Sequence, residues 1–73
     1  MSAEEAIGIA RSVAEREGWP WREPIFANRS RTFILFGKRV WHVMTNADHR
    51  GGNVNVHIDD ATGEVIAKGF AAR

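Results

Sequence analysis

The sequence predicts an α+β domain in which one N-terminal helix packs on a three- or four-stranded antiparallel meander sheet. Three observations predict this class: a helical pattern of small apolar residues opens the chain, a segment with two prolines follows, and short β-type runs separated by turn residues make up the rest. A chain of 73 residues is long enough for one domain. We therefore expect residues 1–73 to form a single domain.

The helix has a start signal and a stop signal. Ser2 and Glu5 form an S-x-x-E capping box, so the helix is expected to begin at about Ala3. Gly18 suits a C-terminal cap and Pro20 forbids continuation, which places the end near Glu17. Apolar residues at helical spacing form one face of small side chains, which favours close packing on a sheet: Ala3, Ala6, Ile7, Ala10, Val13 and Ala14.

The segment "GWPWREP" reads as an extended connection. We expect Trp19 and Trp21 to close the open end of the core rather than to stack on a ligand, because aromatic residues mostly supply buried area. A short extra strand is possible at Ile25 to Ala27.

The stretch "RTFILFGKRVWHVMTN" reads as a hairpin, because two apolar runs flank Gly37 and Lys38. A two-residue II′ turn there places Phe36 opposite Arg39 and Ile34 opposite Trp41. Both faces of this hairpin are apolar, and one helix can cover only one of them. We assign the face of Ile34, Phe36, Trp41 and Val43 to the helix.

The last part of the chain predicts a second hairpin. "NVNVHID" alternates, with Val54, Val56 and Ile58 on one side, and in "DDATGEV" Asp60 can start a turn that Gly63 closes at positive φ. Val65 and Ala67 are then expected opposite Ile58 and Val56. A calcium loop needs five or six oxygen ligands in a fixed pattern, and residues 57–65 lack that spacing.

With this order in place, three stretches resemble the PepSY domain family: "SAEEAIGIA", "WHV" and the closing "VHIDDATGEVI". The resemblance implies a helix packed on an antiparallel sheet and a regulatory or inhibitory role, best known in propeptides of secreted metallopeptidases. The chain departs from the family pattern in having no export signal and no protease domain, and in its "WPW" and "NADHRGG" segments. The matching positions are turn and core positions, so the resemblance implies no catalytic residues.

Composition bounds the remaining function classes. The chain has no cysteine, and ten basic residues nearly balance nine acidic ones, for a formal charge of +1. No serine is near a histidine in sequence, and no phosphate loop or H-E-x-x-H pattern occurs, so we expect no enzyme and no cofactor. The N-terminus lacks a signal-peptide pattern and no long apolar run follows, so we expect a cytoplasmic protein without a membrane segment.

A nucleic-acid-binding module is the third hypothesis. It would use scattered cations interleaved with aromatic rings: Arg22, Arg29, Arg31, Lys38, Arg39 and Arg50 with Trp21, Phe26 and Phe33. The near-zero net charge argues against it.

The second face of the predicted hairpin is the candidate binding surface, because an apolar face that the helix does not cover marks an interaction site. A protein partner or a second copy of the chain would cover it. Its predicted residues are Phe33, Leu35, Val40, His42, Met44, His57 and Ile66.

The alternative hypothesis is a small homodimer that binds a metal or small ligand at this face through His42 and His57, which one register places side by side. Zinc or nickel would need a further protein ligand, and His49 or Asp59 could serve.

Overall fold

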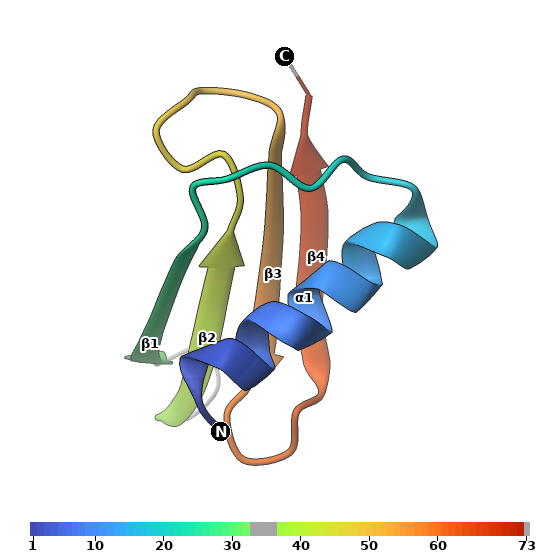
Figure 1. The fold of residues 1–73 in the computed structure, drawn as a ribbon. Coiled ribbons are helices and arrows are strands. Elements are labelled where there is room, and N and C mark those ends of the chain that lie inside the picture. The colour runs from blue at the N-terminus through green and yellow to red at the C-terminus, as the bar shows by residue number, and fades with distance from the viewer. Residues whose placement is uncertain (33–36, 73) are drawn as a thin grey trace.

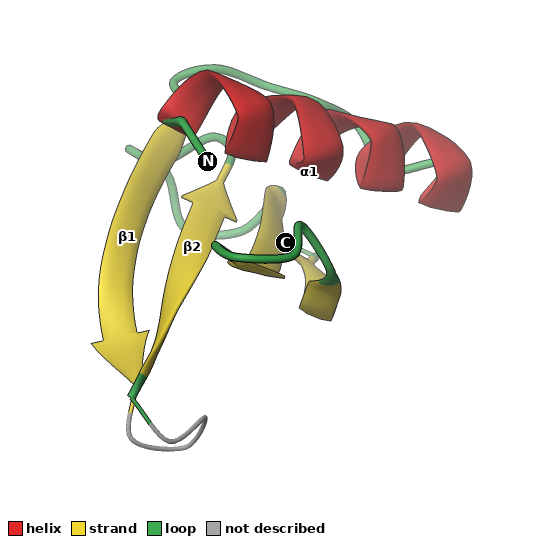
Figure 2. Ribbon diagram, turned by 90° about the horizontal axis from the view of Figure 1, so that it is seen from below, coloured by secondary structure: helices red, strands yellow, loops and turns green. Residues whose placement is uncertain are grey.

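The computed structural model describes residues 1–32 and 37–72. The chain forms one helix, α1 (Ala3–Glu17), followed by four strands, β1 (Phe26–Thr32), β2 (Lys38–Met44), β3 (Asn53–Asp59) and β4 (Val65–Ala71). The strands make one antiparallel sheet in the order β1-β2-β3-β4, and α1 lies across one side of it (Figures 1 and 2). The predicted α+β class, with a helix on a meander sheet, is confirmed.

The helix has the predicted boundaries because its caps are formed. Ser2 Oγ accepts a hydrogen bond from the Glu5 backbone N–H, and the Glu5 carboxylate accepts one from the Ser2 N–H. Gly18 ends α1 in the left-handed conformation, at φ 75°. The fully buried residues of α1 all have small side chains, so the helix lies close to the strands: Ala6, Ala10, Val13 and Ala14.

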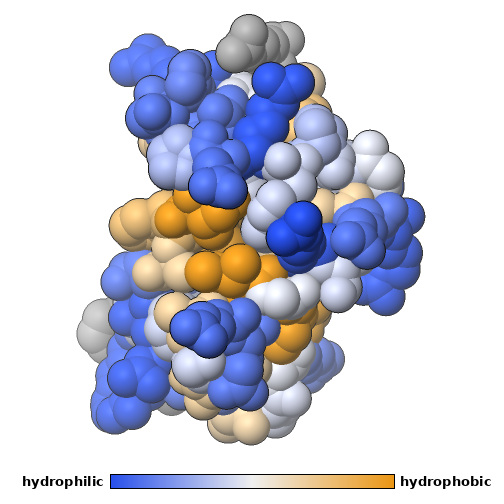
Figure 3. All heavy atoms as spheres, viewed as in Figure 1, coloured by the Kyte–Doolittle hydropathy of each residue, from blue (hydrophilic) through white to orange (hydrophobic). Residues whose placement is uncertain are grey.

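The core lies between α1 and the sheet. Trp41 and Val43 of β2 and three residues of β3 are at most 8% exposed there: Val54, Val56 and Ile58. Trp19 and Trp21 pack half-buried against this core, as predicted, and the segment that contains them runs on the same side of the sheet as α1 (Figure 2). Figure 3 shows apolar surface at the centre of this side, between hydrophilic ends.

The predicted register of the first hairpin is wrong. Strand β1 ends at Thr32, opposite Lys38, and Arg29 rather than Ile34 lies opposite Trp41. The suggested short strand at Ile25 to Ala27 is instead the start of β1, from Phe26. Trp41 and Val43 do face the helix, as predicted, whereas residues 33–36 lie outside the described residues.

The turn between β3 and β4 forms at the predicted place but with different roles for its two aspartates. Asp59 Oδ1, not Asp60, accepts hydrogen bonds from the backbone N–H groups of Ala61 and Thr62, at 2.8 and 3.2 Å. Gly63 has the predicted positive φ, 75°. The side chain of Asp60 is thereby free to point toward the helix side.

A β-bulge changes the pairing after this turn. Val65 lies opposite Ile58 as predicted, but Ala67 lies opposite His57 instead of Val56, so Ile66 is the extra residue of β4. In the described part of the chain, no helix is both long and apolar enough to span a bilayer.

Candidate functional site

The side of the sheet opposite α1, here called the far face, is the candidate site. Side chains alternate between the two sides of each strand, so the positions between the core residues belong to it. Among residues 1–32 and 37–72, no helix or connection lies over this face in either ribbon view (Figures 1 and 2). Cross-strand pairing assigns these residues to the far face: Phe26, Asn28, Ser30, Val40, His42, Met44, Asn55, His57, Asp59, Ala67 and Gly69.

Two stacked histidines occupy the middle of the far face. His42 of β2 and His57 of β3 are direct cross-strand partners, and their rings are parallel within 2° with centroids 4.5 Å apart. The ring of Phe26 meets His42 edge-on at 6.2 Å. Three rings from three neighbouring strands therefore form one continuous patch. One plausible register from the sequence placed His42 and His57 side by side, and the structure has this register.

Within the histidine pair, His57 favours the neutral state. Burial lowers the pKa of His57 from its ordinary value, and the nearby charge of His42 lowers it further. His42 Nε2 lies 2.9 Å from the side-chain oxygen of Asn55, an acceptor that favours the Nε2–H tautomer. The His57 ring is therefore favoured in its uncharged form at neutral pH.

The other predicted site residues differ in how exposed they are. Met44 is half-buried on the far face, opposite both Phe26 and Asn55. Val40 is only 6% exposed, so it leaves a partner little surface to contact. Ile66 is 39% exposed at the bulge of β4. Phe33 and Leu35 lie outside the described residues.

Phe26 is the residue of this patch that the sequence prediction missed. It is 45% exposed and lies opposite Met44 at the start of β1. The predicted hairpin paired β2 with residues 33–36, which left Phe26 outside the sheet face. The one signal for Phe26 in the sequence was the suggested short strand at Ile25 to Ala27, which did not indicate the strand that it pairs with.

The histidine pair is not arranged as a metal chelate. Chelating nitrogens must converge on one ion at about 2.0–2.1 Å. The lone pair of a ring nitrogen lies in the plane of its ring, and the two ring planes are parallel, so the nitrogens do not converge on one ion; Asn55 also lies within hydrogen-bonding distance of His42 Nε2. Within residues 1–32 and 37–72, no group of three or more His, Cys, Asp or Glu side chains could hold a metal. His49, a proposed third ligand, pairs with Asp48 in the loop after β2.

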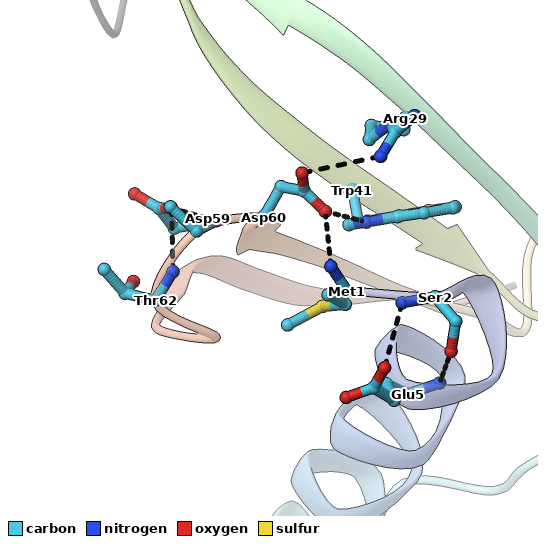
Figure 4. Close-up of polar contacts among 9 residues, drawn as sticks. Met1, Ser2, Glu5, Arg29, Trp41, Asp59, Asp60 and Thr62 are labelled. Carbon is cyan, nitrogen blue, oxygen red and sulfur yellow. Dashed lines mark hydrogen bonds and ion pairs between the residues drawn. The ribbon is translucent and has the colours of Figure 1, made fainter.

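The two aspartates of the last turn have structural partners (Figure 4). Asp60 accepts a hydrogen bond from Trp41 Nε1 at 2.6 Å and lies 3.5 Å from the Met1 amino nitrogen. The hydrogen bond from Trp41 is the main cause of the lowered pKa of Asp60. The hydrogen bond from the Ala61 backbone N–H is the main cause of the lowered pKa of Asp59. Carboxylates held ionised in this way are poor general acids at neutral pH.

A buried polar network, which the sequence did not predict, holds the loop between β2 and β3. The side-chain N–H₂ group of Asn53 donates to the backbone oxygens of Thr45 and Asn46, at 2.8 and 2.9 Å, and its oxygen accepts from the Gly51 N–H. Thr45 Oγ1 accepts from the Val54 N–H. The network fixes the end of the far face next to Met44.

The helix-then-meander order is the arrangement that resemblance to the PepSY family implies. Comparison of the chain with protein-family models, curated proteins and solved structures finds no match. Membership of that family therefore stays a prediction.

Proposed function

We propose that the protein is a noncatalytic protein-binding module that recognises its partner through the far face. The observation that supports this proposal most is the exposed ring of Phe26 packed against the His42–His57 pair, on a side of the sheet that α1 does not cover. The contact surface consists of Phe26, His42, Met44 and His57.

The chemistry of the far face suits a protein surface. Aromatic residues and methionine are enriched at protein interfaces, and a polar rim around an apolar centre is their usual arrangement. Here Asn28 and Asn55 border the rings of Phe26 and His42. Because burial lowers the pKa of His57, its neutral state is favoured, and a partner would not have to desolvate a His57 cation on binding.

The resemblance to PepSY supports a regulatory role for such a module, and inhibition is one form of it. The partner is a different protein or a second copy of this chain. Both occupants would bury the same rings, because a self-complementary patch can serve both copies of a dimer.

A nucleic-acid partner is less well supported by the positions of the cations. Arg29 lies 3.6 Å from Asp60 and its guanidinium lies over the Trp41 ring, on the helix side. Lys38 lies 3.6 Å from Asp59. Cations that are paired with carboxylates of the same chain contribute less to phosphate binding than free ones.

Comparative affinity capture tests the proposal. Immobilised wild-type protein, a Phe26→Asp, Met44→Asp double variant and a matched Ser12→Asp variant would be exposed to one cell extract, with circular dichroism to check folding. Ser12 is exposed on α1, away from the far face. We expect at least one protein to bind the wild type and the Ser12 variant but not the far-face variant. Identical captured sets from all three baits would refute the proposal.

A further inference from the structure

The sheet has two open edges, and they are protected to different extents. Edge strands present unpaired backbone N–H and C=O groups, which proteins shield with charged side chains, bulges or covering elements. On β1 the exposed residues Asn28 to Arg31 include two arginines, of which Arg29 also lies 3.6 Å from Asp60 on the helix side. This composition is typical of an edge that resists pairing.

The β4 edge is less protected beyond its first residues. The bulge at Ile66 interrupts pairing at the start of the strand. Farther along, Ala67 and Gly69 have small side chains on the far face, and the one lysine, Lys68, forms an ion pair with Glu17 of α1 at 3.1 Å. The Lys68 side chain is 45% exposed, so it shields the edge in part, with its ammonium group held on the helix side.

The helix overhangs this edge. In both ribbon views the C-terminal half of α1 extends past β4, away from the rest of the sheet (Figures 1 and 2). A hollow with a volume of about 350 Å³ lies between the helix end and the strand. It is lined by Arg16, Glu17 and the four residues Val65 to Lys68.

We propose that β4 is a docking edge for an extended peptide of a partner protein, which adds a fifth antiparallel strand beneath the overhanging half of α1. Backbone hydrogen bonds to β4 would hold such a peptide, and side-chain pockets on its two sides would select it. This site is distinct from the far-face patch and does not depend on the proposed function.

The side chains around the edge define the peptide. On the helix side, Glu17 neutralises Lys68, which leaves Arg16 as the unneutralised cation among the described residues that line the hollow. A carboxylate of the peptide would pair with Arg16. On the far face, Ala67 and Gly69 leave space for a large apolar side chain, because bulky neighbours cover glycine positions in sheets. The expected peptide alternates acidic with large apolar residues.

A second copy of the chain fits this edge less well. Two sheets joined through β4 would each place an overhanging helix end above the other copy's β4, where the first helix already lies. A single extended peptide has no helix to accommodate there. The overhang therefore favours a peptide over self-pairing.

An NMR titration tests the proposal. The probe is a synthetic nonapeptide that alternates glutamate with valine or phenylalanine, added to nitrogen-15-labelled protein up to ~1 mM. The control peptide has the same composition with all glutamates in one block. We expect saturable shifts centred on the amides of residues 67–70 and Arg16 with the alternating peptide, and much weaker ones with the control.

Three variants make the result specific. Arg16→Glu is expected to weaken binding about three- to fivefold, the range of an exposed ion pair. Arg31→Glu, on the exposed β1 edge, and Phe26→Asp, on the far face, are expected to leave the affinity unchanged. An unchanged affinity in the Phe26 variant would separate this site from the proposed far-face function.

Several results would overturn the proposal. They are the absence of saturable shifts, equal binding of both peptides, or shifts centred on β1. A doubled molar mass with protected β4 amides in the absence of peptide would show that a second copy, not a peptide, occupies the edge.

Discussion

Trp41 Nε1 donates a hydrogen bond of 2.6 Å to Asp60 Oδ1, which ties the middle of β2 to the turn between β3 and β4. The guanidinium of Arg29 lies over the same indole ring, 5.7 Å from its centroid, and 3.6 Å from the other oxygen of Asp60. One carboxylate thus joins β1, β2 and the last turn on the helix side (Figure 4).

Trp41→Phe is expected to lower the free energy of unfolding by about 2–3 kcal/mol, since it removes a hydrogen bond to a charged acceptor and leaves a small void. Trp41 is 8% exposed, so solvent cannot readily replace the lost donor. Urea denaturation measures the difference. Trp21→Phe, at the half-buried rim of the core, is the control and should cost under about 1 kcal/mol. Equal losses in the two variants would contradict the assigned role.

Asp60 should contribute to the acid sensitivity of the fold. Its pKa is lower in the folded chain, mainly through the Trp41 hydrogen bond, so its contribution is fully present above the ordinary aspartate pKa of about 3.9. The contribution is lost as the pH falls through the lower folded pKa. Asp60→Asn should be less stable at neutral pH and lose less stability on acidification, as followed by denaturation at several pH values. Parallel curves for the two proteins would show that Asp60 is not involved.

The small side chains of the buried helix face should be necessary for packing. Ala10 is fully buried, and Ala10→Leu is expected to destabilise the fold by about 1–3 kcal/mol through overpacking. Gly8 is exposed on the same helix, and an added Cβ there meets no atom within 4 Å. Gly8→Ala should therefore stabilise the protein by about 0.5–1 kcal/mol. Thermal unfolding distinguishes the two, and a stabilising Ala10→Leu would mean that the helix is not closely packed.

Asn53 should be essential for the loop between β2 and β3. Asn53→Ala removes the donor for the backbone oxygens of Thr45 and Asn46 and the acceptor for the Gly51 N–H. Because Asn53 is 6% exposed, a loss of about 2–3 kcal/mol is expected by urea denaturation. Asn55→Ala, on the far face, is the matched control and should cost less. A near-neutral Asn53→Ala would show that water replaces the network.

The histidine stack should be visible in the titration of His57. Burial first, and the charge of His42 second, lower its pKa, so its imidazole signals should titrate below the ordinary value of about 6.5. Stability that depends on neutral His57 is fully present above that pH and is lost as the pH falls through the lower folded pKa. His42→Ala should move the midpoint upward in proton NMR. A wild-type midpoint at or above 6.5 would contradict the packed pair.

Sequence reasoning was accurate where the cause of a structure is local. The start of α1 is determined by Ser2 and Glu5, and its end by Gly18 and Pro20. The two residues of each pair are only a few positions apart in the sequence. Gly63 determines the last turn in the same way. These features depend on capping and on glycine's access to positive φ, and neither needs a distant partner.

The first hairpin register could not be obtained in this way, because it depends on which segment pairs with β2. The apolar residues 33–36 resemble a strand by periodicity, whereas β1 reads "FANRSRT" and is mostly polar. An edge strand carries many polar residues because much of it is exposed to solvent, so its composition does not identify it as a strand. This error also hid Phe26. The Asn53 network was missed because buried polar contacts leave no periodic pattern in a sequence.

Site-specific photo-crosslinking tests the far-face proposal most directly. A benzophenone side chain would replace Met44 on the far face or Ser12 on the exposed side of α1, and each protein would be irradiated in the same cell extract. We predict a discrete adduct, with a partner protein or a second copy of the chain, from position 44 and none from position 12. No adduct at position 44, or the same adducts from both positions, would contradict a binding role for the far face.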